Sequence, residues 1–127
     1  KYLVPKVLWY FKIKPQILKY HRTLGTIYFL NGKNNDAINQ IREAYEKDEN
    51  DPLTLNNAGC YYITVNTDLE RGVYNLRAAK NYINKDMDKY QKDTIEENYK
   101  KGKNLLEQYK KAKGNEKLEI PELILFY

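Results

Sequence analysis

The chain has few of the residues that build disulfides, metal sites and sharp turns. Its 127 residues include one cysteine, Cys60, and one histidine, His21. A single cysteine excludes an internal disulfide. One cysteine and one histidine are also too few ligands for a Cys/His zinc site. We therefore expect no cofactor, no metal ion and a reducing compartment. Only four prolines and six glycines are present, which favours helices over a sandwich of many short strands.

The chain also lacks a long hydrophobic run. No stretch approaches the roughly 18 apolar residues that a membrane-spanning helix needs. The first residue is Lys1 rather than Met, so we expect a longer parent protein, and membrane tethering of that parent stays open. The prediction for the chain itself is a cytoplasmic location.

The composition suits one soluble globular domain, since 42% of the residues are hydrophobic and 31% are charged. The net charge of +5 is divided into blocks. Residues 1–35 carry seven Lys/Arg and no acid, residues 36–70 carry eight acids and two bases, and residues 71–113 carry twelve bases and six acids. A nucleic-acid-binding protein more often has one continuous basic face. The blocks therefore argue against nucleic acid and favour a protein partner.

Two sets of landmarks repeat along the chain. Gly25 and Tyr28 recur 34 residues later as Gly59 and Tyr62. A second set recurs at an offset of 35 residues, with Ala37, Ile41 and Ala44 matched by Gly72, Leu76 and Ala79. The difference predicts one extra residue in the turn around residues 65–68. Because a period near 34 is typical of stacked helical hairpins, we expect two such hairpins.

Local signals mark the ends of these helices. Asn31-Gly32 predicts a helix end, and Asn34–Asp36 offers side-chain oxygens to cap the next helix. Asp51-Pro52 combines an N-cap with a proline at the first helical position. Thr67 or Asp68 is expected to cap the fourth helix. Apolar side chains at Ile38 and Tyr45 extend the stripe of the second helix.

A further helix is expected after a turn at residues 84–86. It carries one heptad-like seam on an otherwise charged surface, made of Ile95, Tyr99, Gly102, Leu106 and Tyr109. A single apolar stripe is what a terminal capping helix requires, because no further repeat covers its outer face. A short two-chain coiled coil is the alternative.

Residues 18–51 resemble a tetratricopeptide repeat at its packing positions, which are Leu24, Gly25, Tyr28, Gly32, Ala37, Ile41 and Ala44. Residues 52–86 resemble a second copy, without the turn glycine, at Ala58, Gly59, Tyr62, Gly72, Leu76 and Ala79. The resemblance implies an all-α fold of antiparallel helical hairpins, stacked as a short superhelix of the tetratricopeptide type. Residues 87–113 would form the C-terminal capping helix. The single domain 1–127 would also have a basic aromatic N-terminal segment, 1–17, and an apolar tail, 114–127.

The resemblance also implies a groove lined by the first helix of each hairpin. The residues expected to face a partner there are Lys19, Arg22, Thr26 and Phe29, and then Leu53, Asn56, Cys60 and Ile63. Such a face suits an extended acidic and apolar segment, with the two cations meeting a carboxylate. The alternative leaves Lys19 and Arg22 as solvated surface cations. The family's C-terminal carboxylate clamp uses asparagine where Thr26 and Cys60 stand, so we do not expect that clamp.

The residues that could support catalysis are few. His21 lies on a helix where the family has a packing aromatic, so we expect it to pack. Cys60 lies within a helix, with no second base nearby in the sequence, which argues against a nucleophile. The acids of residues 43–51 lack the alternation and central glycine of a calcium loop. We therefore expect no catalytic residues.

The two ends carry the most apolar segments. Residues 7–11 are aromatic and aliphatic and are flanked by lysines. We expect them to form a short helix between Pro5 and Pro15 that packs on the first hairpin, with a membrane-interface role as the alternative. The apolar tail should be covered too, either by its own domain or by the groove of a neighbouring copy.

We therefore predict a non-catalytic interaction module, a scaffold that binds a partner's peptide or helix in a repeat groove. The alternative function is a membrane-associated assembly domain that uses its basic aromatic N-terminus at a lipid surface.

Overall fold

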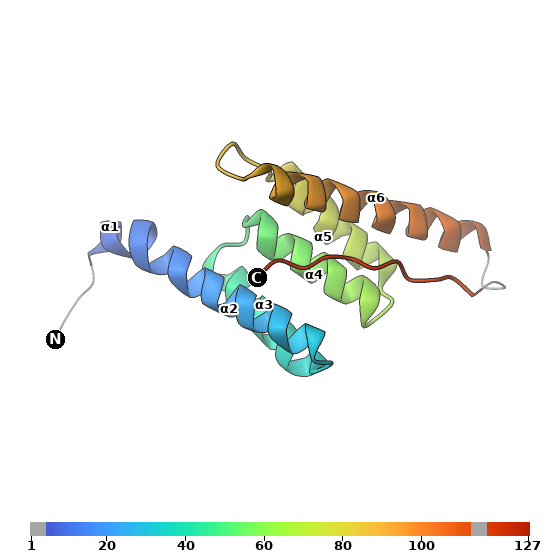
Figure 1. Cartoon of the computed structure of the whole chain (residues 1–127), viewed down its shortest axis with the longest axis horizontal. Helices are drawn as coiled ribbons and strands as arrows, with labels where there is room; N and C mark the ends of the chain where they lie inside the picture. Colours follow the sequence, from blue (N-terminus) through green and yellow to red (C-terminus); the bar gives the residue numbers. More distant parts are fainter. Residues whose placement is uncertain (1–4, 113–116) are drawn as a thin grey trace. The chain divides into compact units, whose positions relative to one another are not determined.

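The structure, a computed structural model, describes residues 5–112 and 117–127, and every regular element in these two stretches is helical. The predicted all-α fold is confirmed. The elements form two compact units, one comprising the chain up to Glu49 together with Tyr127, and the other Asn50–Phe126 (Figure 1). Each unit is described by itself below.

The first unit begins with a helix that is longer than expected. Its parts are α1 (Lys6–Leu8), a π-helical stretch η1 (Trp9–Ile13) and α2 (Lys14–Leu30). Pro15 lies in the first turn of α2, immediately after the π-helical stretch, and π-helical turns occur where the regular i→i−4 hydrogen-bond pattern of a helix is interrupted. The prediction that a short helix ends at Pro15 is therefore wrong.

The first hairpin pairs α2 with α3 (Asn34–Lys47). Gly32 has a φ of +74°, the left-handed conformation that ends many helices and that glycine adopts without strain. A Cβ added at Gly25 would lie 3.3 Å from Ile41 Cγ1 and 3.4 Å from the Ala37 carbonyl oxygen. The two helices therefore approach closely at Gly25, which is one of the expected packing positions.

Two details of α3 differ from the prediction. The helix already includes Asn34, and its N-cap residue, Lys33, makes no side-chain cap, so the expected capping by Asn34–Asp36 is wrong. Ala37, Ile38, Ile41 and Ala44 are buried as expected, whereas Tyr45 is 41% exposed. Leu24 and Tyr28 on α2 are half-buried.

The second hairpin, in the second unit, pairs α4 (Pro52–Thr64) with α5 (Leu69–Asn81). The Asp51 carboxylate accepts hydrogen bonds from Thr54 N and Thr54 Oγ1, at 3.0 and 2.6 Å. Asp68 accepts from Arg71 N at 3.2 Å, so both predicted caps are confirmed. The turn before α5 contains Thr67 at a φ of 49°, and this residue takes the left-handed conformation that Gly32 supplies in the first hairpin.

Two glycines bring the backbones of α4 and α5 into direct contact. A Cβ at Gly59 would lie 2.8 Å from Gly72 O, and a Cβ at Gly72 would lie 3.0 Å from Gly59 O. The first distance is shorter than real Cβ contacts, the second is at their lower limit, and a Cβ at Gly72 would lie closer still to Ile63 Cγ1. The other second-repeat positions are also buried, namely Ala58, Tyr62, Leu76 and Ala79.

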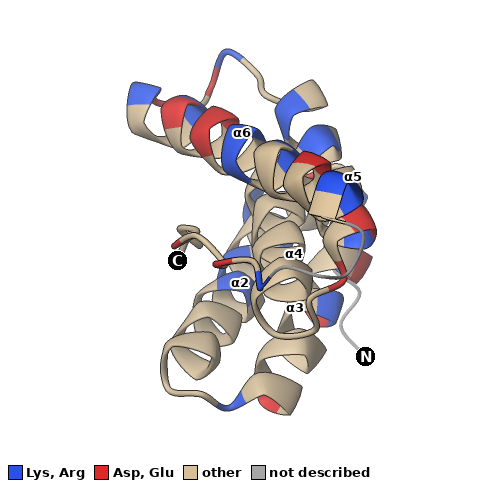
Figure 2. Cartoon of the chain, turned by 90° about the vertical axis from the view of Figure 1, so that its right-hand side faces the viewer, with Lys and Arg blue, Asp and Glu red and all other residues tan. Residues whose placement is uncertain are grey.

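The last helix, α6 (Lys89–Ala112), packs on this hairpin through one stripe. A Cβ at Gly102 would lie 3.0 Å from Leu76 Cδ1 and 3.1 Å from Ile63 Cδ1. Lysines and acids occupy much of the remaining surface of α6 (Figure 2). Part of the expected seam is wrong, because the buried residues are Thr94, Ile95, Asn98, Gly102 and Leu105, whereas Tyr109 is 56% exposed.

No helix in the described stretches combines the length and the apolar character needed to cross a membrane.

Candidate functional site

The most unusual feature of the second unit is its extended C-terminal segment. Residues 117–127 form no helix, and within the second unit residues 117–126 run alongside α4 (Figure 1). The side chains of Leu123, Leu125 and Phe126 are buried, whereas that of Ile124 is 42% exposed. The sequence predicted that the apolar tail is covered either by its own domain or by a neighbouring copy, and in this structure its own domain covers it. Residues 114–116 of the tail lie outside the described residues.

Three buried asparagines face this segment. Asn56 and Asn57 belong to α4 and Asn98 belongs to α6, and each is at most 1% exposed. Asparagine is a poor residue for a helix interior, and an amide buried without hydrogen bonds costs free energy. Their presence in the core therefore requires partners for each amide.

The main chain of the tail supplies those partners. Asn98 Nδ2 donates to Ile124 O at 2.8 Å, and Asn98 Oδ1 accepts from Ile124 N at 3.2 Å. Asn57 Nδ2 donates to Phe126 O at 2.9 Å, and its Oδ1 accepts from Phe126 N at 2.8 Å. Each of these two amides thus binds both polar main-chain groups of one tail residue.

This pattern reproduces half of an antiparallel strand pair. In such a pair a residue exchanges both of its main-chain hydrogen bonds with one neighbour, and residues two apart use the same edge. A helix cannot act as that neighbour through its own backbone, because its N–H and C=O groups bond to each other. A side-chain amide carries one acceptor and two donors, so Asn57 and Asn98 can take the neighbour's place opposite Phe126 and Ile124.

The third asparagine holds the other two in position. Asn56 Nδ2 donates to Ile124 O at 3.0 Å and to Asn57 Oδ1 at 3.3 Å. Asn56 Oδ1 accepts from Asn98 Nδ2 at 2.9 Å. Both donors of Asn56 and both donors of Asn98 are therefore used. No buried side-chain N or O atom in the described stretches lacks a hydrogen bond, and a fully satisfied buried network favours one geometry.

Cys60 lies beside this network. Its sulfur lies 3.8 Å from Ile124 O and 3.6 Å from Asn98 Nδ2, beside the shorter hydrogen bonds that these atoms make with the asparagines. The side chain is fully buried, and this burial raises the pKa of the thiol far above its ordinary value. Cys60 therefore stays protonated near neutral pH and lines the site as a small apolar group.

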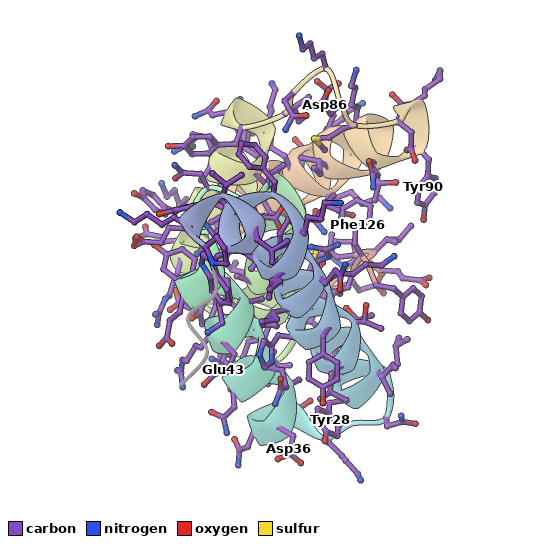
Figure 3. The ribbon with its side chains drawn as sticks, turned by 90° about the vertical axis from the view of Figure 1, so that its left-hand side faces the viewer. Tyr28, Asp36, Glu43, Asp86, Tyr90 and Phe126 are labelled. Carbon is purple, nitrogen blue, oxygen red and sulfur yellow. The ribbon has the colours of Figure 1, made fainter. Side chains whose placement is uncertain are left out.

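The ring of Phe126 enters an apolar pocket. It clusters with the buried side chains of Leu55, Ala79 and Ile95. The ring of Tyr90 meets it edge to face, with centroids 6.3 Å apart and planes at 89°; both residues are labelled in Figure 3. Partly buried side chains complete the wall, namely Leu53, Ala78, Ile83 and Met87.

The predicted groove residues of the second hairpin divide into two groups. Asn56 and Cys60 contact Ile124 O, and Leu53 packs against the cluster around Phe126. Ile63 is fully buried. Its side chain packs directly against Gly72 and Gly102 and fills the space that a side chain at either glycine would need. The expectation that Ile63 faces a partner is therefore wrong, because it belongs to the core.

The predicted groove residues of the first hairpin do not share one exposed face. Lys19 is exposed and borders a shallow hollow of about 400 Å³ on α2. Arg22 and Thr26 are buried, and Phe29 is half-buried. Arg22 Nε donates to the main-chain oxygen of Tyr127 at 3.1 Å, so the alternative of a solvated Arg22 is wrong.

His21 bonds across the first hairpin. Its Nδ1 lies 2.6 Å from Gln40 Oε1, and its ring meets that of Tyr20 edge to face. This contact links α2 to α3. No three His, Cys, Asp or Glu side chains in the described part of the chain gather closely enough to hold a metal ion.

Four of the apolar side chains of residues 7–11 are exposed to solvent, whereas Trp9 is half-buried. Val7, Leu8, Tyr10 and Phe11 are 69%, 40%, 54% and 77% exposed. The prediction that these side chains pack on the first hairpin is therefore wrong. Lys14 Nζ lies 5.0 Å from the centre of the Tyr10 ring.

The sequence prediction missed Asn57 and Asn98, the two residues that bind the tail most completely. A signal for them was present in each helix. Asn56-Asn57 interrupts the apolar helix α4, and Asn98 lies three residues after Ile95 and four before Gly102, on the buried stripe of α6.

Comparison with known proteins gives no relative: no protein-family model, curated protein or solved structure matches the chain. The geometry around the tail therefore carries the functional argument.

Proposed function

We propose that the chain is a non-catalytic protein-interaction module, related in its design to tetratricopeptide repeats, whose second unit binds an extended polypeptide segment by its main chain. The observation that carries the proposal is the double hydrogen bonding of Asn98 to Ile124 and of Asn57 to Phe126. In the chain by itself, residues 118–126 are the segment that the second unit binds.

The tail is attached in the way that a peptide ligand is attached. Its described hydrogen bonds to the helices run from side chains to its main chain, and Phe126 is the anchor in an apolar pocket. Recognition of an extended main chain, with pockets for some of its side chains, is a general mode of peptide binding. It does not depend on the covalent link through residues 113–116, so a separate segment could bind in the same way.

The tether explains why the chain's own tail holds the site when no partner is present. A segment joined by a short linker acts at an effective concentration on the order of millimolar. A partner segment must therefore bind more tightly than the tail, or act after the tail has been released.

The experiment that tests this uses the complete folded chain. Residues 113–116 are replaced by a protease site, the folded chain is cut, and a fluorescent peptide of residues 118–127 is exchanged for the released tail. Saturable binding is expected, measured by fluorescence anisotropy. Asn98→Leu should weaken it strongly, whereas Asn81→Leu, an exposed position on α5, should not. No saturable binding to the cut chain, or equal effects of both substitutions, would contradict the proposal.

A second function, at a membrane surface, is favoured by a separate observation. The four exposed apolar side chains of residues 7–11 lie among Lys6, Lys12 and Lys14, and residues 1–35 contain no acid. Exposed aromatic and aliphatic side chains with lysines around them suit the interface of an anionic bilayer.

Vesicle co-sedimentation tests this second function. Binding to anionic vesicles at low salt is expected, and Val7→Ser with Phe11→Ser should abolish it. Tyr74→Ser is the matched control, since Tyr74 is also 70% exposed but lies on α5. Absence of vesicle binding by the unmodified chain would remove the membrane function.

A further inference from the structure

The tail site distinguishes between the positions of its occupant, although its hydrogen bonds go to the main chain. The side chain of Phe126 is 6% exposed, whereas that of Ile124 is 42% exposed. Both residues give their main-chain N and O to an asparagine. One position is therefore held by main chain and side chain together, and the other by main chain alone.

The pocket around Phe126 suits an aromatic ring. Its walls are aliphatic side chains, and Tyr90 presents its ring at right angles to that of Phe126. Edge-to-face pairs are more favourable than burial of the same area alone, because the positive edge of one ring meets the negative face of the other. An alanine in this place would leave the pocket empty, whereas a lysine in place of Ile124 could extend into solvent.

The side chains on either side of Ile124 are buried. Leu123 and Leu125 are 7% and 8% exposed. The site therefore accepts a four-residue pattern over positions 123–126: an aliphatic residue, any residue, an aliphatic residue and an aromatic residue.

A second copy of this chain is a poor competitor for the site. Its tail is identical to the resident tail, so exchange adds no contact and loses the advantage of the tether. A segment of another protein can differ from the resident tail at every position except the three buried ones. It can therefore gain contacts outside residues 123–126 that the resident tail does not make.

On the basis of the proposed function, we infer that the partner is a segment of another protein with this four-residue pattern, and that the chain's own tail competes with it for the same site. The aromatic residue is the main determinant of selectivity. The tail sets the affinity that a partner must exceed.

A set of synthetic peptides tests the pattern on the cut chain described above. The set contains residues 118–127 unchanged, with Phe126→Ala, and with Ile124→Lys. Phe126→Ala should weaken binding by about a hundredfold or more, as expected for truncation of a buried phenylalanine. Ile124→Lys should change it by less than about threefold, as for most exposed positions.

The possible results separate this inference from the proposed function. If the unchanged peptide fails to bind, the proposed function fails. If it binds and Phe126→Ala binds equally well, or Ile124→Lys weakens binding as much as Phe126→Ala, the main-chain site stands and the inferred pattern is wrong.

Competition by the tail is tested with the uncut chain. The unchanged peptide should bind the uncut chain at least about tenfold more weakly than the cut chain, because the tethered tail occupies the site. Equal affinities would overturn the competition. Dimers formed by tail exchange, seen by light scattering at rising concentration, would overturn the assignment to another protein.

Discussion

Asn98 and Ile124 exchange two hydrogen bonds, of 2.8 and 3.2 Å, across 26 residues of sequence. Through this pair, a helix holds an extended segment in the way that one β-strand holds another. Asn57 and Phe126 repeat the relationship from α4. Two helices thus present, through their side chains, the donor and acceptor pattern of a sheet edge.

Substitution of Asn98 tests the stabilising role of these bonds. Asn98→Ala removes the donor to Ile124 O and the acceptor for Ile124 N, and it leaves Asn56 Oδ1 without its partner. The free energy of unfolding should fall by about 1–3 kcal/mol, as for buried polar groups that lose their partners. Urea denaturation followed by circular dichroism measures the change. Asn104→Ala, at an exposed position of the same helix, is the control and should stay within about 0.5 kcal/mol.

The contrast between Phe126 and Ile124 should also appear in stability. Phe126→Ala empties the pocket formed by Leu55, Ala79 and Ile95, and should cost about 3–5 kcal/mol. Ile124→Thr keeps both main-chain groups and a β-branched side chain at an exposed position, so its cost should be below about 1 kcal/mol. Thermal unfolding of the two variants under identical conditions makes the comparison. Similar losses for both would mean that the tail is not anchored through Phe126.

The matching glycines of the two repeats should respond differently to alanine. A Cβ at Gly59 would lie 2.7 Å from Leu76 Cγ and 2.8 Å from Gly72 O, whereas the nearest atom at Gly25 is 3.3 Å away. A side chain forced against a backbone lowers the free energy of unfolding by about 1–3 kcal/mol or more. Alanine in place of glycine in a helix raises it by about 1 kcal/mol, so the two effects oppose each other. We expect Gly59→Ala to destabilise the chain and Gly25→Ala to be nearly neutral in urea denaturation. A loss at Gly25 as large as that at Gly59 would contradict the closer packing of α4 and α5.

Burial of Cys60 predicts a pH dependence with a definite sign. Its pKa is raised in the folded chain above the ordinary value of 9.0, so the unfolded chain loses the thiol proton first as pH rises. The stabilisation is therefore complete below pH 9 and declines above it. The stability difference between the unmodified chain and Cys60→Ala should shrink as the pH rises above about 9. A pH-independent difference would contradict a buried, protonated thiol.

The parts of the fold that follow from short-range signals could be predicted. Asp51-Pro52 marks the start of α4, and Gly25 and Gly59 mark where each hairpin closes, because each signal acts through neighbours within one hairpin. The tail site could not be found in this way. Asn56 and Asn98 are 42 residues apart, and both meet Ile124 only after α6 has packed on the second hairpin.

The misassigned seam of α6 has the same physical origin. An apolar pattern places Tyr99 inside and Asn98 outside. In the structure the tail gives Asn98 the partners that make its burial favourable, whereas the Tyr99 hydroxyl accepts from Arg77 Nε at 3.4 Å on the exposed side. The partner of a buried polar residue decides its position, and in this case that partner comes from the far end of the chain.

The most direct measurement of main-chain recognition replaces one backbone N–H of the bound segment. Peptides of residues 118–127 are made with an ester oxygen in place of Phe126 N, which donates to Asn57. A control peptide has the ester at Glu122 N, for which the described residues show no hydrogen bond. Both keep every side chain, and both are titrated into the cut chain. The ester at Phe126 should weaken binding about five- to tenfold while the ester at Glu122 leaves it unchanged; equal affinities for the two peptides would contradict recognition of the main chain.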